Sequence, residues 1–239
     1  MASRGLARSH LTLAVIVVVS AALVAGAAWG IYGHLPPRLE GMIVALAGGA
    51  LIVSVVLELV DPATKVAPLW AVVAFVLVGA GAFVMLDVAV NRRLGSTSGG
   101  GLLAAITLDG IPENLALGVA LIGAGPLQVA SLSGSIFLSN LPEAAGGAQE
   151  MAEGRSRARV MALWTATAVL LSVAALVGNL ALDDVPSSAL GLIRCFAAGA
   201  VVASLSTEVF PKAFREARYE TGVATAAGLV LAIALDQLG

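Results

Sequence analysis

Two proline–glutamate motifs interrupt apolar stretches of the chain, and they contain the side chains best suited to bind a cation. The first motif runs from Asp109 to Asn114 (DGIPEN), and the second follows 30 residues later, from Ser139 to Glu143 (SNLPE). Because proline lacks an amide hydrogen, Pro112 and Pro142 each free a backbone carbonyl one turn earlier. A membrane helix tolerates such a break only where other groups or water satisfy the carbonyl. We therefore expect both motifs to face the interior of a helical bundle.

The spacing of the polar residues predicts a metal-binding surface on each helix. Asp109 and Glu113 are four residues apart, and so they project from one helical face. Asn140 and Glu143, three residues apart, do the same. Carboxylates at the middle of a bilayer cost at least about 2.5–3.5 kcal/mol each, and they normally mark an ion or proton path. Arg194 is the only basic residue expected inside a span, and one arginine cannot neutralise three carboxylates. We therefore expect these carboxyls either to be protonated or to bind a divalent cation together with the amide oxygen.

Further polar residues extend this candidate pathway. Asn114 and Ser139 adjoin the central carboxylates, and Gln149 and Glu150 follow near the end of the second helix. Glu150 is equally well a solvated charge. A single proline–glutamate pair is also explained by a kink whose carboxyl bonds a nearby hydroxyl. Two matching motifs in consecutive helices argue against that simpler interpretation.

The composition places the motifs in a membrane protein. Of the 239 residues, 59% are hydrophobic and only 12% are charged, whereas about a quarter of the residues of a soluble domain are charged. The chain has no basic tail for nucleic acid, and its single Cys195 excludes an internal disulfide or a CxxC motif. There is no HExxH motif and no histidine inside a predicted span. We therefore expect neither an enzyme nor a prosthetic group.

Apolar runs of about 20 residues predict eight transmembrane helices in one domain covering residues 1–239. The predicted spans are roughly 11–33, 41–61, 67–90, 101–123, 126–151, 159–181, 187–210 and 220–238. The loops after the first, third, fifth and seventh spans carry nine basic residues, and the other side carries three. Because cytoplasmic loops hold the excess of lysine and arginine, both termini are predicted to lie outside the cytoplasm, with the protein in the plasma membrane.

An internal repeat organises these spans. Residues 41–58 align without a gap with residues 191–208, and seven of the 18 positions are identical. The two segments lie in spans five helices apart, so they cross the membrane in opposite directions. Inverted repeats are typical of secondary transporters. Helices 1–3 and 6–8 would then flank helices 4 and 5, and Glu58 and Glu208 would lie at the two mouths of a pathway.

In this order the motifs resemble the ZIP (Zrt/Irt-like protein) family of divalent-metal transporters, near its bacterial branch. The fourth helix of that family typically reads His-Asn-x-Pro-Glu and the fifth carries a related motif, which Asp109–Glu113 and Ser139–Glu143 resemble. Gly48–Pro62 and Gly199–Pro211 are similar to its second and seventh helices. The resemblance implies eight helices in a three–two–three arrangement and zinc or a related metal as cargo. Where the family often has histidine this chain has Asp109, and oxygen ligands favour harder ions such as manganese or iron(II).

The leading hypothesis is therefore transport of divalent transition-metal cations by alternating access, with proton exchange at the same carboxylates as the coupling. The alternative is a transport-incompetent metal or proton sensor, or an accessory subunit, of the same fold. The expected partners are the lipid bilayer and the metal ions, and a homodimer is left open.

Overall fold

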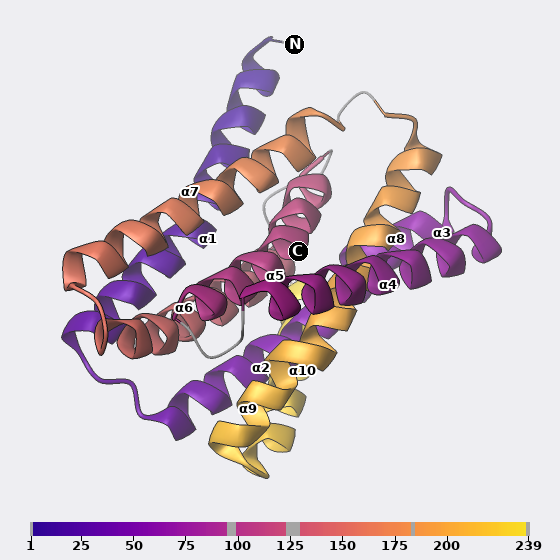
Figure 1. Cartoon of the computed structure of the whole chain (residues 1–239). Coiled ribbons are helices and arrows are strands. Elements are labelled where there is room, and N and C mark those ends of the chain that lie inside the picture. The colour runs from indigo at the N-terminus through magenta and orange to yellow at the C-terminus, as the bar shows by residue number, and fades with distance from the viewer. Residues whose placement is uncertain (1, 95–98, 123–129, 183–184, 238–239) are drawn as a thin grey trace.

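The computed structural model describes residues 2–94, 99–122, 130–182 and 185–237 (Figure 1). Within these ranges, the side chains of residues 2–12, 91, 93–94, 99–106, 108–109 and 130–131 lie outside the description. The described chain is all-helical, with 89% helix and no strand. Its elements are α1 (Ala2–Tyr32), α2 (Pro37–Val55), the π-helical turn η1 (Val56–Val60), α3 (Asp61–Thr64), α4 (Leu69–Leu94), α5 (Gly99–Ala120), α6 (Ala130–Ala152), α7 (Arg157–Leu180), α8 (Ser187–Ser204), the π-helical turn η2 (Leu205–Val209), α9 (Phe210–Ala217) and α10 (Glu220–Asp236).

The segments α2–η1–α3 and α8–η2–α9 are continuous helical rods. Each rod contains one wide π-helical turn, η1 or η2. In η1 the Asp61 amide reaches back five residues to the Val56 carbonyl, and in η2 Phe210 does the same to Leu205. The next residue in each rod is a proline, which cannot donate to the carbonyl four residues before it. The helix that contains the predicted seventh span, 187–210, continues to Ala217, because the wide turn accommodates the proline.

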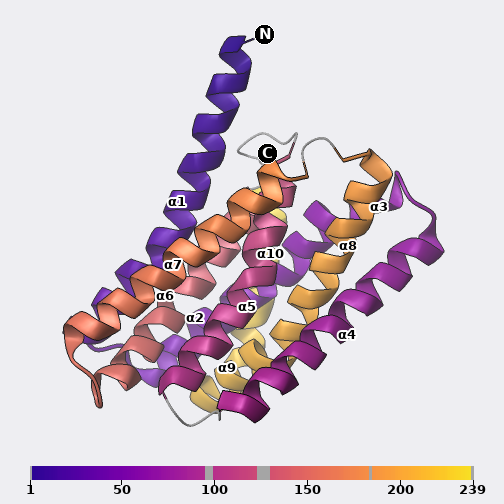
Figure 2. The same cartoon turned by 45° about the horizontal axis from the view of Figure 1, so that its top comes forward.

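The two rods lie side by side and run in opposite directions. A Cβ on Gly41, at the start of α2, would lie 2.9 Å from the Ala213 carbonyl oxygen near the end of the other rod. A Cβ on Gly191, at the start of α8, would lie 3.3 Å from the Cα of Ala63 near the end of α3. The two contacts are equivalent, because Gly191 follows Gly41 by 150 residues and Ala213 follows Ala63 by 150 residues. The beginning of α1 and the end of α10 lie at one end of the bundle, opposite α9 (Figure 2).

Close backbone contacts between the outer helices repeat in the same way. In the α2–α10 pair, a glycine on each helix meets a backbone carbonyl of the other helix. The α8–α4 pair has the same two contacts. The contacts are Gly49 with Thr225, Gly228 with Leu46, Gly199 with Val76, and Gly79 with Phe196. In each of them a Cβ would overlap the facing carbonyl oxygen, so only glycine allows this approach. The α2–α10 pair therefore corresponds to the α8–α4 pair, contact by contact.

Helices α5 and α6 occupy the centre between these pairs. Helix α6 packs against α1 and α2, and helix α5 packs against α7 and α8. Apolar side chains pack in the interior of the bundle, where Leu117, Ile136 and Val201 are at most 1% exposed. This arrangement places the two proline–glutamate helices inside the bundle, as their polarity predicted.

The outer surface of the bundle is apolar. Leu77 and Met85 on α4, Leu180 on α7 and Val223 on α10 are each at least 66% exposed. Five described segments are long and apolar enough to cross a membrane. They are Leu13–Tyr32, Pro37–Thr64, Leu69–Val90, Arg157–Leu180 and Ser187–Ala217. A helix that is apolar on its outer face requires lipid around it. The chain is a multi-pass membrane protein.

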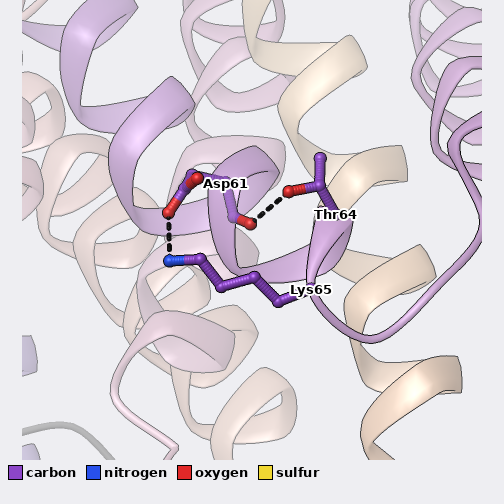
Figure 3. A network of polar contacts seen from close by, with 3 residues as sticks. All are labelled: Asp61, Thr64 and Lys65. Atoms are coloured by element: carbon purple, nitrogen blue, oxygen red, sulfur yellow. Dashed lines mark hydrogen bonds and ion pairs between the residues drawn. The ribbon is translucent and has the colours of Figure 1, made fainter.

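The rod α2–η1–α3 ends in a small exposed network (Figure 3). The Lys65 ammonium pairs with the Asp61 carboxylate at 2.6 Å, one turn away. The Thr64 hydroxyl donates to the Asp61 backbone carbonyl at 2.7 Å. Both contacts are local and solvated, so they finish the helix and contribute little to the stability of the bundle.

Candidate cation site

Helix α5 presents two buried polar side chains just after its internal proline, Pro112. Glu113 is 3% exposed and Asn114 is 1% exposed. The Asn114 amide nitrogen donates to the Gly110 carbonyl at 2.9 Å, which fixes the orientation of the amide. Glu113 Oε1 and Asn114 Oδ1 are buried and have no hydrogen-bond partner among the described residues. Two consecutive residues of α5 thus each bury an acceptor oxygen that has no partner in the described chain.

Helix α6 supplies the facing group. Ser139, Asn140 and Glu143 are all buried around its internal proline. The Ser139 hydroxyl donates to Glu143 Oε1 at 2.8 Å and holds that carboxylate in place. Glu143 and Glu113 interact electrostatically across the two helices. Since two buried carboxylates repel each other unless a proton or cation lies between them, this pair is the strongest candidate for a cation site.

The sequence predicted a third carboxylate here, Asp109. Its backbone belongs to α5, but its side chain lies outside the described residues. Among the side chains that are described, no group of three histidine, cysteine, aspartate or glutamate residues converges on one point. The described site therefore consists of two carboxylates together with amide and hydroxyl groups.

Buried hydroxyls connect α6 to α2 beside this site. Ser135 and Ser139 precede Glu143 at intervals of four residues, and all three are buried. The Ser135 and Ser54 hydroxyls lie 3.5 Å apart across the α2–α6 contact. Ser54 is in turn one turn before Glu58 on the rod α2–η1–α3. Polar side chains thus extend from the central carboxylates towards Glu58.

Glu58 and Glu208 lie within the two π-helical turns, one on each rod. Both are half-buried, and each interacts with an aspartate of the neighbouring outer helix. Glu58 interacts with Asp236 of α10, and Glu208 hydrogen-bonds Asp87 of α4. The wide turns, the glutamates and their aspartate partners therefore occur twice, at corresponding places in the two rods. Sequence reasoning anticipated both glutamates but not the π-helical turns that carry them.

The remaining predicted pathway residues lie further along α6. Gln149 is partly buried, and its Oε1 has no hydrogen-bond partner in the described chain. Glu150 is exposed. The interpretation of Glu150 as a solvated charge therefore fits its position.

The charge balance inferred from the sequence is wrong in one respect, because Lys212 is not a loop residue. It belongs to α9, its side chain is 22% exposed, and its ammonium forms a 2.7 Å ion pair with Glu40 at the start of α2. It also interacts with Glu143 and Glu216. Glu40 is only 6% exposed. One face of the rod carries a charged residue at every fourth position: Glu208, Lys212 and Glu216. This spacing in the sequence was the signal that the helix continues past Pro211.

Arg194, the one basic residue expected inside a span, forms hydrogen bonds at the end of α5. Its guanidinium Nη2 donates to the Val119 carbonyl at 3.1 Å and to the Ile122 carbonyl at 3.4 Å. The Asn179 amide donates to the neighbouring Gly118 carbonyl at 3.0 Å. The last turn of a helix leaves its carbonyls without amide partners. Arg194 and Asn179 therefore cap α5, and the charge of Arg194 acts on Glu58.

Comparison with known proteins gave no match: no family model matches the chain, and no curated protein matches it.

Proposed function

We propose that this protein is a ZIP-like carrier of divalent metal cations that binds its cargo between α5 and α6. The observation that carries the proposal is the buried pair Glu113 and Glu143, two carboxylates that interact in the interior of a membrane protein. Glu113 Oε1 and Asn114 Oδ1 have no partner in the described chain, so they are free to accept a cation. Asn140 is buried on α6, and its Nδ2 has no partner in the described chain, so a half-turn of the amide presents its oxygen at that position instead. The order of the two proline–glutamate motifs supports the ZIP resemblance.

Alternating access is the mechanism that the repeated contacts favour. The two rods run antiparallel, and their glycine contacts with α10 and α4 correspond to each other. Carriers built from inverted repeats move one part of the bundle against another around a central site. We infer that all eight helical segments cross the bilayer, with Glu58 at one mouth and Glu208 at the other. The excess of basic residues assigns the α9 end to the cytoplasm and both termini to the outside.

The chemistry of the site favours a hard or borderline cation. Apart from the Lys212 ammonium, the polar side chains described for this site offer oxygen, and none is a histidine or a cysteine. Oxygen ligands suit manganese and iron(II) better than they suit ions that prefer nitrogen or sulfur. We therefore propose manganese or iron(II), with zinc as the cargo that the family resemblance implies.

The proposal is tested by metal flux into proteoliposomes that contain the purified protein. A panel of manganese, iron(II), zinc, calcium and magnesium is compared between the wild type, Glu113→Gln and Glu143→Gln. Each substitution keeps the shape of the side chain and removes its charge, and we expect flux to fall at least tenfold. Glu150→Gln is the matched control, because it removes an exposed carboxylate from the same helix. Wild-type flux in both Glu113→Gln and Glu143→Gln would rule out this site.

A second function, metal sensing without transport, is favoured by one observation. Lys212 interacts with Glu143, so a protein side chain already provides part of the positive charge that the carboxylates need. Equilibrium binding separates the two functions. A sensor binds metal to the purified protein, loses that binding in Glu113→Gln, and produces no flux for any ion of the panel. A carrier does both.

A further inference from the structure

The two ends of the repeated rods differ at the positions that correspond to each other. At the α9 end, Gly41 lies against Glu216, whereas at the opposite end Gly191 lies against Val66. Val66 precedes Glu216 by 150 residues, so these are equivalent positions. Among the described residues, the α9 end therefore has a largely buried ion pair between the two rods, whereas the Lys65–Asp61 pair at the opposite end is exposed and lies within one rod.

The centre of this network is the ion pair between Glu40 and Lys212. The two charged atoms lie 2.7 Å apart, and the Glu40 side chain is only 8% exposed. Gly146 of α6 makes room for the pair, since a Cβ at that position would overlap the Glu40 carboxylate. Gly146 follows Glu143 by three residues, so the pair sits on the face of α6 that carries the central carboxylate.

Three elements meet at this ion pair. Glu40 comes from α2, Lys212 from α9, and the space between them from α6. The ammonium also interacts with Glu143, so its positive charge acts on the central carboxylate. A cation bound at Glu143 is repelled by the positive charge of Lys212. The ion pair described at the opposite end, Lys65–Asp61, is exposed and joins residues of one rod only.

We propose that the Glu40–Lys212 ion pair is a lock that closes the α9 end of the pathway and makes the two mouths inequivalent. The lock ties α2 to α9 across the face of α6, and the α9 end opens only when the pair separates. The inference rests on the alternating access of the proposed function, but it does not depend on a metal as the cargo. Lys212 and Glu40 are positioning residues here, because they set which mouth is closed.

The lock is tested by the accessibility of a cysteine at the depth of the central site, without added metal. The reporter is Ser139→Cys in a Cys195→Ala background, labelled by a membrane-impermeant cationic methanethiosulfonate reagent. Labelling is followed from each side of the membrane, in intact cells and in inverted vesicles. A second reporter, Tyr219→Cys, lies in the connection after α9 and identifies the α9 side, because Tyr219 is 88% exposed.

Breaking the lock should raise the labelling rate of the buried reporter from the α9 side only. We expect about a tenfold rise or more in Lys212→Met and in Glu40→Gln, because a buried charge that loses its partner destabilises the closed arrangement. The swapped pair, Glu40→Lys with Lys212→Glu, should restore slow labelling. Arg38→Gln is the matched control, since it breaks the exposed Arg38–Glu220 pair at the same end of α2.

The outcomes separate the lock from the transport function. If Lys212→Met and Glu40→Gln both label at the rate of the parent reporter protein, the lock is wrong. It is also wrong if Arg38→Gln raises the labelling rate as much as they do. If either single variant fails to fold, the swapped pair decides, because fast labelling in a folded swapped protein also overturns the lock. A wild type that carries no metal but shows the expected labelling pattern contradicts only the proposed cargo. Unchanged labelling with intact metal flux contradicts only the lock.

Discussion

Gly49 of α2 lies directly against the backbone carbonyl of Thr225 in α10, with no space for a side chain between the two helices. Its equivalent, Gly199, lies against Val76 of α4 in the same way. We predict that Gly49→Ala and Gly199→Ala each destabilise the protein by about 1–3 kcal/mol, because the added methyl group forces the paired helices apart. Thermal unfolding of the detergent-purified protein measures the effect.

Gly81→Ala is the control for these two substitutions. Gly81 lies in the middle of α4, but a Cβ there meets nothing within 4 Å. Alanine favours a helix over glycine by about 0.5–1 kcal/mol, so Gly81→Ala should leave the melting temperature unchanged or raise it. If all three variants melt at the same temperature as the wild type, the close glycine contacts do not determine helix pairing.

The Ser139 hydroxyl donates to Glu143 at 2.8 Å and orients the carboxylate towards the site. Removing a group that positions a metal ligand typically lowers affinity by about 10–100-fold. We therefore predict that Ser139→Ala weakens divalent metal binding by about tenfold, measured by titration of the purified protein. Ser206→Ala is the control, because that exposed hydroxyl bonds only the Val202 carbonyl of its own rod. Equal affinity in Ser139→Ala and wild type would remove Ser139 from the site.

Arg194 and Lys65 allow a comparison of a half-buried cation with an exposed one. Arg194 caps α5 through the Val119 carbonyl, and buried hydrogen bonds of a charged group contribute about 1.5–3 kcal/mol. Lys65 forms an exposed pair with Asp61, worth at most about 1 kcal/mol. We predict that Arg194→Met lowers the melting temperature clearly, whereas Lys65→Met leaves it nearly unchanged. Similar melting temperatures for the two variants would contradict the capping role of Arg194.

The proline after each π-helical turn gives a further prediction. Pro211→Ala restores an amide hydrogen in the first turn of α9, which favours a regular α-helix over the wide turn η2. We expect a gain in stability on the order of 1 kcal/mol together with lower metal flux, because straightening the rod turns Glu208 away from its place at the mouth. Melting temperature and proteoliposome flux are measured on the same preparation.

Pro37→Ala serves as the comparison for Pro211→Ala. Pro37 is at the first position of α2, where a helix does not use the amide hydrogen, so both stability and flux should stay at their wild-type values. Full flux in a stabilised Pro211→Ala variant would show that the wide turn is not needed for transport.

Much of the architecture followed from the sequence because bilayer-length apolar runs have few alternatives to a helix. Most described helices begin and end within a few residues of the predicted spans, but α1 begins nine residues before the first span and α9 continues the seventh to Ala217. The burial of Glu113 and Glu143 also followed, since a carboxylate in an apolar helix must turn away from lipid. The repeat was visible because its matched glycines and glutamates recur at one fixed distance along the chain.

The tertiary structure decided what the local pattern left open. Lys212 looked like a loop residue because a proline precedes it, but the π-helical turn extends the helix and carries its ammonium to Glu40, 172 positions earlier in the chain. Arg194 was the one basic residue expected inside a span, and the packing of α8 brings it to the end of α5. The sequence by itself determined which residues must be buried, because transfer out of water acts on each side chain separately. Only the packing of distant helices decided which charge meets which, because a pairing depends on the positions of both partners in space.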